Sequence, residues 1–149
     1  MQVTLAKALK ERSRLAGKLK MNFDLINREN SMISGSQRSF DLHELHQECF
    51  QLHNRLIEIK KIIAKANAPI AEKLVEMDEL KSMISYLRNV NTTIGWQQQR
   101  YSSEKACYEA VLGSSELMAE ADQLQKRAEQ LQDELDEFNA LTKVEIPEQ

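Results

Sequence analysis

The chain has 149 residues, with 20 Lys and Arg against 23 Asp and Glu, and only 4 Gly and 2 Pro. This length predicts one domain, residues 1–149. Gly and Pro reach only about a third of the roughly 12% found in an average protein, so a turn-rich sandwich or barrel is not expected. Hydrophobic residues make up 42% and aromatic residues 5%, which favours an all-α core of Leu, Ile, Met and Ala between packed helices.

The first predicted helix covers residues 4–31. Its expected inward side chains recur at helical spacing: Leu5, Leu9, Leu15, Leu19, Phe23 and Ile26. Residues 1–20 carry six basic side chains and one acidic side chain, so this helix is basic and amphipathic. A serine-rich linker at 33–39 follows it.

The second predicted helix, residues 41–66, has the clearest pattern in the chain. Asp41 as N-cap and Glu44 three residues later form an Asp-type capping box, and Phe40 and Leu45 can form a hydrophobic staple across it. A strict 3-4 spacing follows for 25 residues and indicates a heptad seam: Leu42, Leu45, Cys49, Leu52, Leu56, Ile59, Ile63 and Ala66.

Two further helices are predicted, at 70–101 and 115–142. The third carries Ile70, Leu74, Met77, Leu80, Ile84, Leu87, Asn91 and Ile94 on one side. Because three residues connect it to the second helix, these two are expected to form an antiparallel hairpin. The fourth repeats a heptad pattern with Leu117, Ala121, Leu124, Ala128, Leu131, Leu135 and Phe138. The overall prediction is therefore a bundle of long antiparallel amphipathic helices.

Residues 102–113 form a short irregular segment with two interpretations. A helix is consistent with Ser103 followed by Glu104, Ala106 and Ala110. A strand is consistent with the alternation of residues 106–112. Local propensity slightly favours the helix, and the alternatives stay open.

Several short runs resemble the septicolysin-like family of small bacterial helical proteins. They are Arg55-Leu56-Ile57, Ala66-Asn67-Ala68, Asp78-Glu79-Leu80 and Arg100-Tyr101-Ser102, followed by a Leu- and Gln-rich final helix. The resemblance implies four helices, an extended segment near 102–113 and no established biochemical activity. The family name suggests a cytolysin.

No motif for catalysis or cofactor binding occurs: the sequence has no P-loop, GxGxxG, GxSxG, HExxH or CxxC pattern. His46, Cys49 and His53 fall on one helical stripe, an arrangement that could offer zinc ligands. A straight helix spreads these positions over about 10 Å, so one ion would be held by at most two of them unless a neighbouring chain supplied the other ligands. We therefore predict no enzyme activity, no cofactor and no metal.

The composition also bears on membranes, nucleic acids and location. The longest apolar runs are three residues, whereas a membrane span needs roughly 20, so no stable insertion is expected. The net charge is −3, and the basic N-terminal cluster lacks interleaved aromatic residues, so no nucleic-acid binding is expected. Two cysteines do not suggest a disulfide framework, and a reducing, cytoplasmic location is predicted.

The favoured function is a non-enzymatic structural or interaction protein that forms a homo-oligomer through its heptad helices or binds another protein. The interface candidates are Trp96, Tyr101, Tyr108 and Leu112. Tryptophan is enriched at binding hot spots, and the other three lie in a segment of about a dozen residues that is too apolar for a solvated linker and is expected to be covered by another subunit. The alternative is a membrane-active, cytolysin-like protein that uses the basic amphipathic N-terminal helix.

Overall fold

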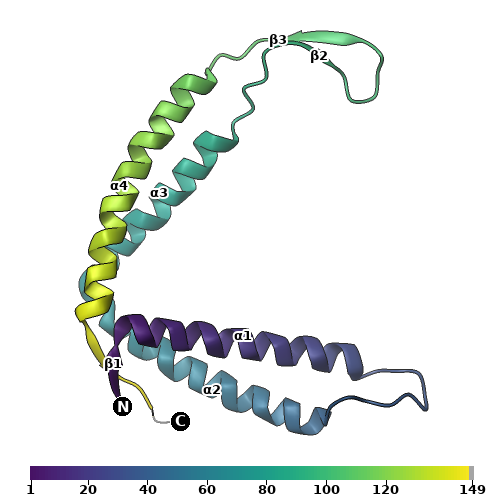
Figure 1. Cartoon of the computed structure of the whole chain (residues 1–149), viewed down its shortest axis with the longest axis vertical. Helices are drawn as coiled ribbons and strands as arrows, with labels where there is room; N and C mark the ends of the chain where they lie inside the picture. Colours follow the sequence, from purple (N-terminus) through teal and green to yellow (C-terminus); the bar gives the residue numbers. More distant parts are fainter. Residues whose placement is uncertain (148–149) are drawn as a thin grey trace. The chain divides into compact units, whose positions relative to one another are not determined.

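A computed structural model describes residues 1–147 and contains four α-helices and four short strands among them. The elements divide into two compact units (Figure 1). One contains residues 1–69 and the chain from residue 136 onward, and the other contains residues 70–135. The helical class is confirmed, and the prediction of one domain stays a prediction.

The first unit is built on two antiparallel helices, α1 (Leu5–Glu29) and α2 (Leu42–Ala66), which lie side by side (Figure 1). Helix α2 begins at the predicted N-cap Asp41, and α1 begins one residue after the predicted start, with Thr4 as its N-cap. The Thr4 hydroxyl accepts a hydrogen bond from the backbone N–H of Lys7, and the Asp41 carboxylate accepts from those of His43 and Glu44. These caps satisfy N–H groups that have no partner within the helix.

Asn22, not Phe23, is the buried residue in this part of α1. Asn22 is 1% exposed and Phe23 is 54% exposed, so the expectation that Phe23 points inward is wrong. From Leu15, steps of four and three residues lead through Leu19 to Asn22, which keeps one face toward α2. Position 23 falls beside that face.

A two-stranded sheet closes the first unit and was not predicted. Strand β1 (Gln2–Thr4) pairs antiparallel with β4 (Lys143–Glu145), with Val3 opposite Val144. Each strand has only three residues, too few for a recognisable alternation. The buried core of this unit combines residues from both helices and both chain ends: Val3, Leu5, Ala8, Leu15, Leu19, Cys49, Leu52, Leu56, Ile59, Ile63, Val144 and Ile146.

The second unit contains α3 (Ala71–Asn89) and most of α4 (Ser114–Leu141). Ion pairs join Lys73 to Glu134 and Glu76 to Arg127, an order that makes the two helices antiparallel. Leu87 packs with Leu117 and Ala121 at their other end. The start of α4 agrees with the prediction of 115–142 to within a residue.

The expected hairpin between helices 41–66 and 70–101 is not supported. The heptad face of α2 packs on α1, and α3 forms ion pairs with α4 instead. A three-residue 3-10 turn, Ala68–Ile70, separates α2 from α3. The short connection therefore did not determine which helices pack together.

The predicted helix at 70–101 is too long, because α3 ends at Asn89. The Asn89 side chain donates a hydrogen bond to the carbonyl of Ser85, and the backbone becomes extended at Val90. Asn91 then accepts hydrogen bonds from the N–H and hydroxyl of Thr93. This local bonding competes with a helix, and β-branched residues from Val90 to Ile94 weaken it further.

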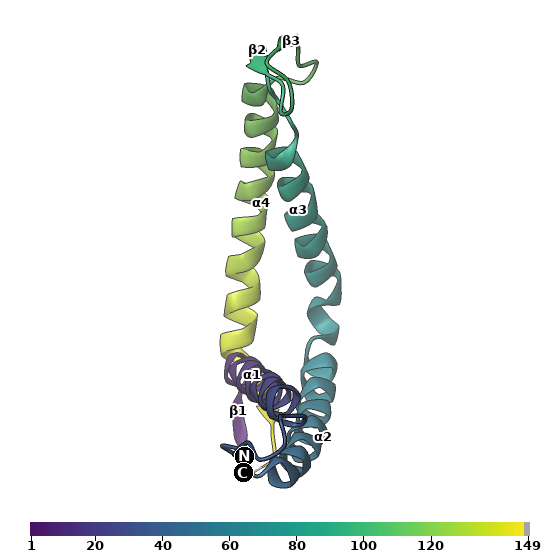
Figure 2. The same cartoon turned by 90° about the vertical axis from the view of Figure 1, so that its right-hand side faces the viewer.

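The chain between α3 and α4 forms a β-hairpin (Figure 2). Strand β2 (Gly95–Gln98) pairs antiparallel with β3 (Lys105–Tyr108). The strand interpretation is therefore correct for Lys105–Tyr108, residues 109–112 lie outside the strand, and the helix interpretation of 102–113 is wrong. A helix would have left the amides of residues 95–98 without strand partners.

Candidate functional site

The candidate interaction site is the β2–β3 hairpin, residues 95–108, with the residues just outside it. It contains three of the four interface candidates, Trp96, Tyr101 and Tyr108, and Leu112 follows it by four residues. Trp96 was expected within a helix and lies in a strand. The structure thus gathers residues that the sequence placed on two separate elements.

The strand register separates the two strand aromatics onto opposite faces of the hairpin. Trp96 lies opposite Cys107, and Tyr108 lies opposite Gly95. Paired residues share a face and successive residues alternate. Trp96 and Tyr108 therefore belong to different faces, so the hairpin has no purely polar side.

These aromatic side chains are open to solvent. Trp96 is 71% exposed and Tyr101, in the turn, is 98% exposed. Tyr108 and Leu112 are also exposed. Tryptophan and tyrosine at such positions are the residues that most often supply binding energy at protein interfaces.

Local hydrogen bonds fix the turn that carries Tyr101. The N–H of Gln99 donates to the carbonyl of Glu104 over 3.2 Å, and the N–H of Glu104 donates to the hydroxyl of Ser102 over 3.1 Å. Gly95 begins β2 with a φ of 76°, a conformation that favours glycine. Hydrogen bonds within the turn therefore fix its backbone, and the Tyr101 side chain stays exposed.

Sequence reasoning missed three exposed residues of this site. They are Ile94, Arg100 and Val111. Ile94 was assigned to the inner face of the third helix. The run of β-branched residues before Gly95 was the signal that could have ended that helix earlier.

The candidate zinc ligands on α2, His46, Cys49 and His53, do not come together at one position. Cys49 is buried in the core, whereas His46 and His53 are exposed. The His46 ring packs edge-on against Phe50, with ring centroids 5.2 Å apart. Within residues 1–147, no group of three or more His, Cys, Asp or Glu side chains is placed to hold an ion.

The Cys49 environment disfavours the thiolate. Burial raises the pKa of the Cys49 thiol, and the nearby negative charge of Glu48 raises it further. Metal binding and nucleophilic chemistry both require the thiolate. Cys49 therefore acts as a small apolar residue of the helix seam.

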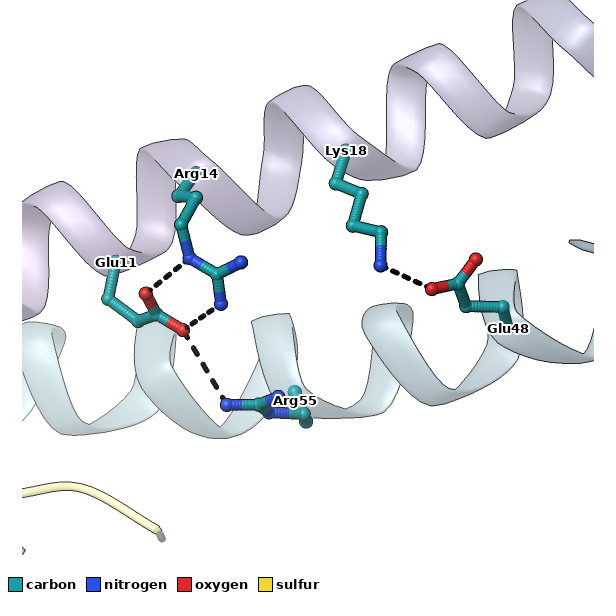
Figure 3. Close-up of polar contacts among 5 residues, drawn as sticks. All are labelled: Glu11, Arg14, Lys18, Glu48 and Arg55. Carbon is teal, nitrogen blue, oxygen red and sulfur yellow. Dashed lines mark hydrogen bonds and ion pairs between the residues drawn. The ribbon is translucent and has the colours of Figure 1, made fainter. Parts of the chain in front are cut away.

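A polar network of Lys18, Asn22 and Glu48 crosses between α1 and α2 and was also missed; Figure 3 shows its contact between Lys18 and Glu48. The Asn22 amide donates to the Glu48 carboxylate over 2.9 Å, and the Lys18 ammonium donates to the same carboxylate. Hydrogen bonds from Lys18 and then Asn22 lower the pKa of Glu48. The network adds a polar contact between α1 and α2 to their apolar seam.

A second set of charges in Figure 3 centres on Glu11. Arg14 donates two hydrogen bonds to its carboxylate, over 2.7 and 2.6 Å, and Arg55 of α2 lies 3.5 Å away. The hydrogen bonds from Arg14 lower the pKa of Glu11 despite its partial burial. Two arginines from different helices thus share one carboxylate.

Comparison with known proteins identifies the family. Residues 12–144 match DUF6847, a family of unknown function. The chain belongs to this family. The DUF6847 match spans both units and includes the hairpin. No curated protein matches the sequence.

One solved structure has the same fold as this DUF6847 member. It is described as a functionally unknown conserved protein from Corynebacterium diphtheriae. The similarity has a TM-score of 0.77 at 23% identity and covers 97% of this chain and 100% of the other. The comparisons lend no support to the septicolysin-like resemblance.

Proposed function

We propose that this protein is a non-enzymatic interaction protein that binds a second copy of itself through the β2–β3 hairpin. The observation that carries the proposal is the exposure of Trp96 and Tyr108 on opposite faces of the hairpin. An antiparallel sheet that has one face in water commonly carries polar side chains on that face. Aromatic residues on both faces favour a hairpin that is enclosed by a partner.

The size of the hairpin supports the same proposal. Each strand has four residues, and the sheet has two strands. An isolated two-stranded hairpin is at best marginally stable in water. Its outer edges also carry unpaired backbone groups, which can pair with a strand of another chain.

The hairpin is a better candidate for the self-association surface than the heptad faces that first suggested self-association. The heptad face of α2 already packs on α1 within the chain. In α4, Leu117 and Ala121 are covered by α3. The hairpin, in contrast, has apolar side chains that its own unit leaves uncovered, so it is the better surface for association.

The membrane-active alternative is not favoured. The apolar stripe of α1, which would have to enter a bilayer, is buried against α2. Among residues 1–147, none of the helices has the length and apolar character required to cross a membrane. We further propose a cytoplasmic location, where the free thiols of Cys49 and Cys107 stay reduced.

Light scattering across the micromolar range tests the proposal. The protomer has a mass of 17.2 kDa, and we expect a multiple of this mass. The double variant Trp96→Ser, Tyr108→Ser should return to the protomer mass with unchanged helical circular dichroism. Its matched control, Phe50→Ser with Tyr86→Ser, removes two exposed aromatics from helices and should still associate.

Two outcomes would contradict the proposal. A wild-type protein that stays at the protomer mass at every concentration does not self-associate. A hairpin double variant that keeps the wild-type mass associates through another surface.

A further inference from the structure

A pocket of about 300 Å³ lies in the first unit, away from the hairpin. It is formed by early turns of α1, central turns of α2, Met1 and the chain that follows β4. Its apolar lining consists of the exposed residues Met1 and Pro147 beside the core residues Ile59 and Ile146, which are only 3% and 7% exposed. Neither the proposed self-association nor the polar network around Glu48 uses this pocket.

The rim of the pocket carries more positive than negative charge. Four cationic side chains, those of Lys7, Lys10, Arg14 and Arg55, stand against the carboxylates of Glu11 and Glu58. Glu11 is already engaged by Arg14 and Arg55 (Figure 3). Within the described residues, Lys7 and Lys10 have no ion-pair partner.

Arg55 supplies a second reason to expect an anion. Its side chain is 35% exposed, and its contact with Glu11 spans 3.5 Å. In the part of the chain that the structure describes, its guanidinium makes no hydrogen bond to another residue. Arginine has five N–H donors arranged to bind a carboxylate, so Arg55 retains donors at the pocket wall.

We propose that this pocket binds a medium-chain fatty acid, with the carboxylate at Lys7, Lys10 and Arg55 and the hydrocarbon chain along Met1 and Pro147. An inorganic anion would use the rim and leave the apolar lining in water. A neutral apolar molecule would use the lining and leave the cations unpaired. A volume of about 300 Å³ is at the small end for ligand pockets, which favours a short chain such as octanoate.

Titration of the ¹⁵N-labelled full chain with octanoate, below its micelle-forming concentration, tests the proposal. We expect saturable amide shifts confined to the pocket residues. Octanamide, which keeps the chain and lacks the charge, and acetate, which keeps the charge and lacks the chain, should each bind about tenfold more weakly. Absence of saturation with octanoate, or equal affinity for octanoate and either analogue, would overturn the proposal.

A pair of charge variants adds a matched control. Lys7→Gln with Lys10→Gln should weaken octanoate binding about fivefold, and both side chains are exposed, so the fold is retained. Lys60→Gln with Lys61→Gln makes the same change in net charge outside the pocket and should change the affinity less than about twofold. Equal effects of the two pairs would show non-specific attraction and refute the site. Self-association, measured separately, does not depend on this result.

Discussion

The buried amide of Asn22 in α1 donates a 2.9 Å hydrogen bond to the carboxylate of Glu48 in α2. Asn22 is 1% exposed and lies within an otherwise apolar seam. Buried polar residues at such seams can fix the register of two helices at some cost in stability. We therefore expect the pair to fix how α1 and α2 align along their length.

Replacing Asn22 by Ala should lower the free energy of unfolding by about 1–2 kcal/mol, because the hydrogen bond and its packing are lost. Urea denaturation measures this change. Asn54→Ala, at an exposed position of α2, is the control and should have little effect. Equal midpoints for the wild type and Asn22→Ala would contradict the role of the network.

Acid should weaken the first unit. The pKa values of Glu11 and Glu48 are lowered below the ordinary 4.5 in the folded chain, so the unfolded chain binds more protons as the pH falls through that value. Their stabilising contribution is present above about pH 4.5 and is lost as the pH falls through their folded pKa values. We expect the urea midpoint to decrease over this window.

The double variant Glu11→Gln, Glu48→Gln tests that assignment. Its urea midpoint should depend less on pH over the same window, because neither carboxylate remains to titrate. Glu120→Gln, an exposed residue without an ion-pair partner in the described chain, should keep the wild-type dependence. A double variant with an unchanged pH profile would show that other groups control acid sensitivity.

The fluorescence of Trp96 should report self-association directly, because it is the only tryptophan in the sequence. Its 71% exposure in the protomer predicts emission typical of a hydrated indole at high dilution. Raising the protein concentration should shift the emission to shorter wavelength as a partner covers the ring. Emission that does not change while the mass increases would place Trp96 outside the interface.

Val144→Ala should destabilise the chain by about 1–2 kcal/mol, because Val144 is 9% exposed and packs in the core of the first unit. Val111→Ala makes the same deletion at a side chain that is 99% exposed and should change stability by no more than about 0.5 kcal/mol. Thermal unfolding by circular dichroism compares the two. Similar melting temperatures would show that the β1–β4 sheet contributes little.

Two glycine substitutions should change the stability of the folded chain in opposite directions. Gly17→Ala lies in α1, where an added methyl group has no neighbour within 4 Å, so it should stabilise the chain by about 0.5–1 kcal/mol. Gly95→Ala forces a φ of 76° on a residue with a side chain and should destabilise the hairpin. Urea denaturation and Trp96 emission measure these effects, and a stabilising Gly95→Ala would contradict the described backbone.

The sequence by itself determined the helical class and the ends of the helices that have strong local signals. Asp41 as N-cap predicted the start of α2 correctly, because capping depends on a side chain and the amides two or three residues away. The apolar spacing from Leu117 to Leu135 predicted α4 in the same way. Residue type indicated Trp96 as an interface candidate, and the apolar character of the segment between the last two predicted helices indicated Tyr101 and Tyr108.

Only the tertiary structure decided which elements pair. The register that places Trp96 opposite Cys107 depends on strands separated by a turn, and the pairing of Val3 with Val144 joins residues at opposite ends of the chain. A heptad pattern predicts that a helix packs on a partner but does not identify the partner. The apolar spacing of α2 therefore could not predict that it packs on α1. Local signals depend on neighbouring residues, whereas pairing depends on the free energy of burying whole faces against one another.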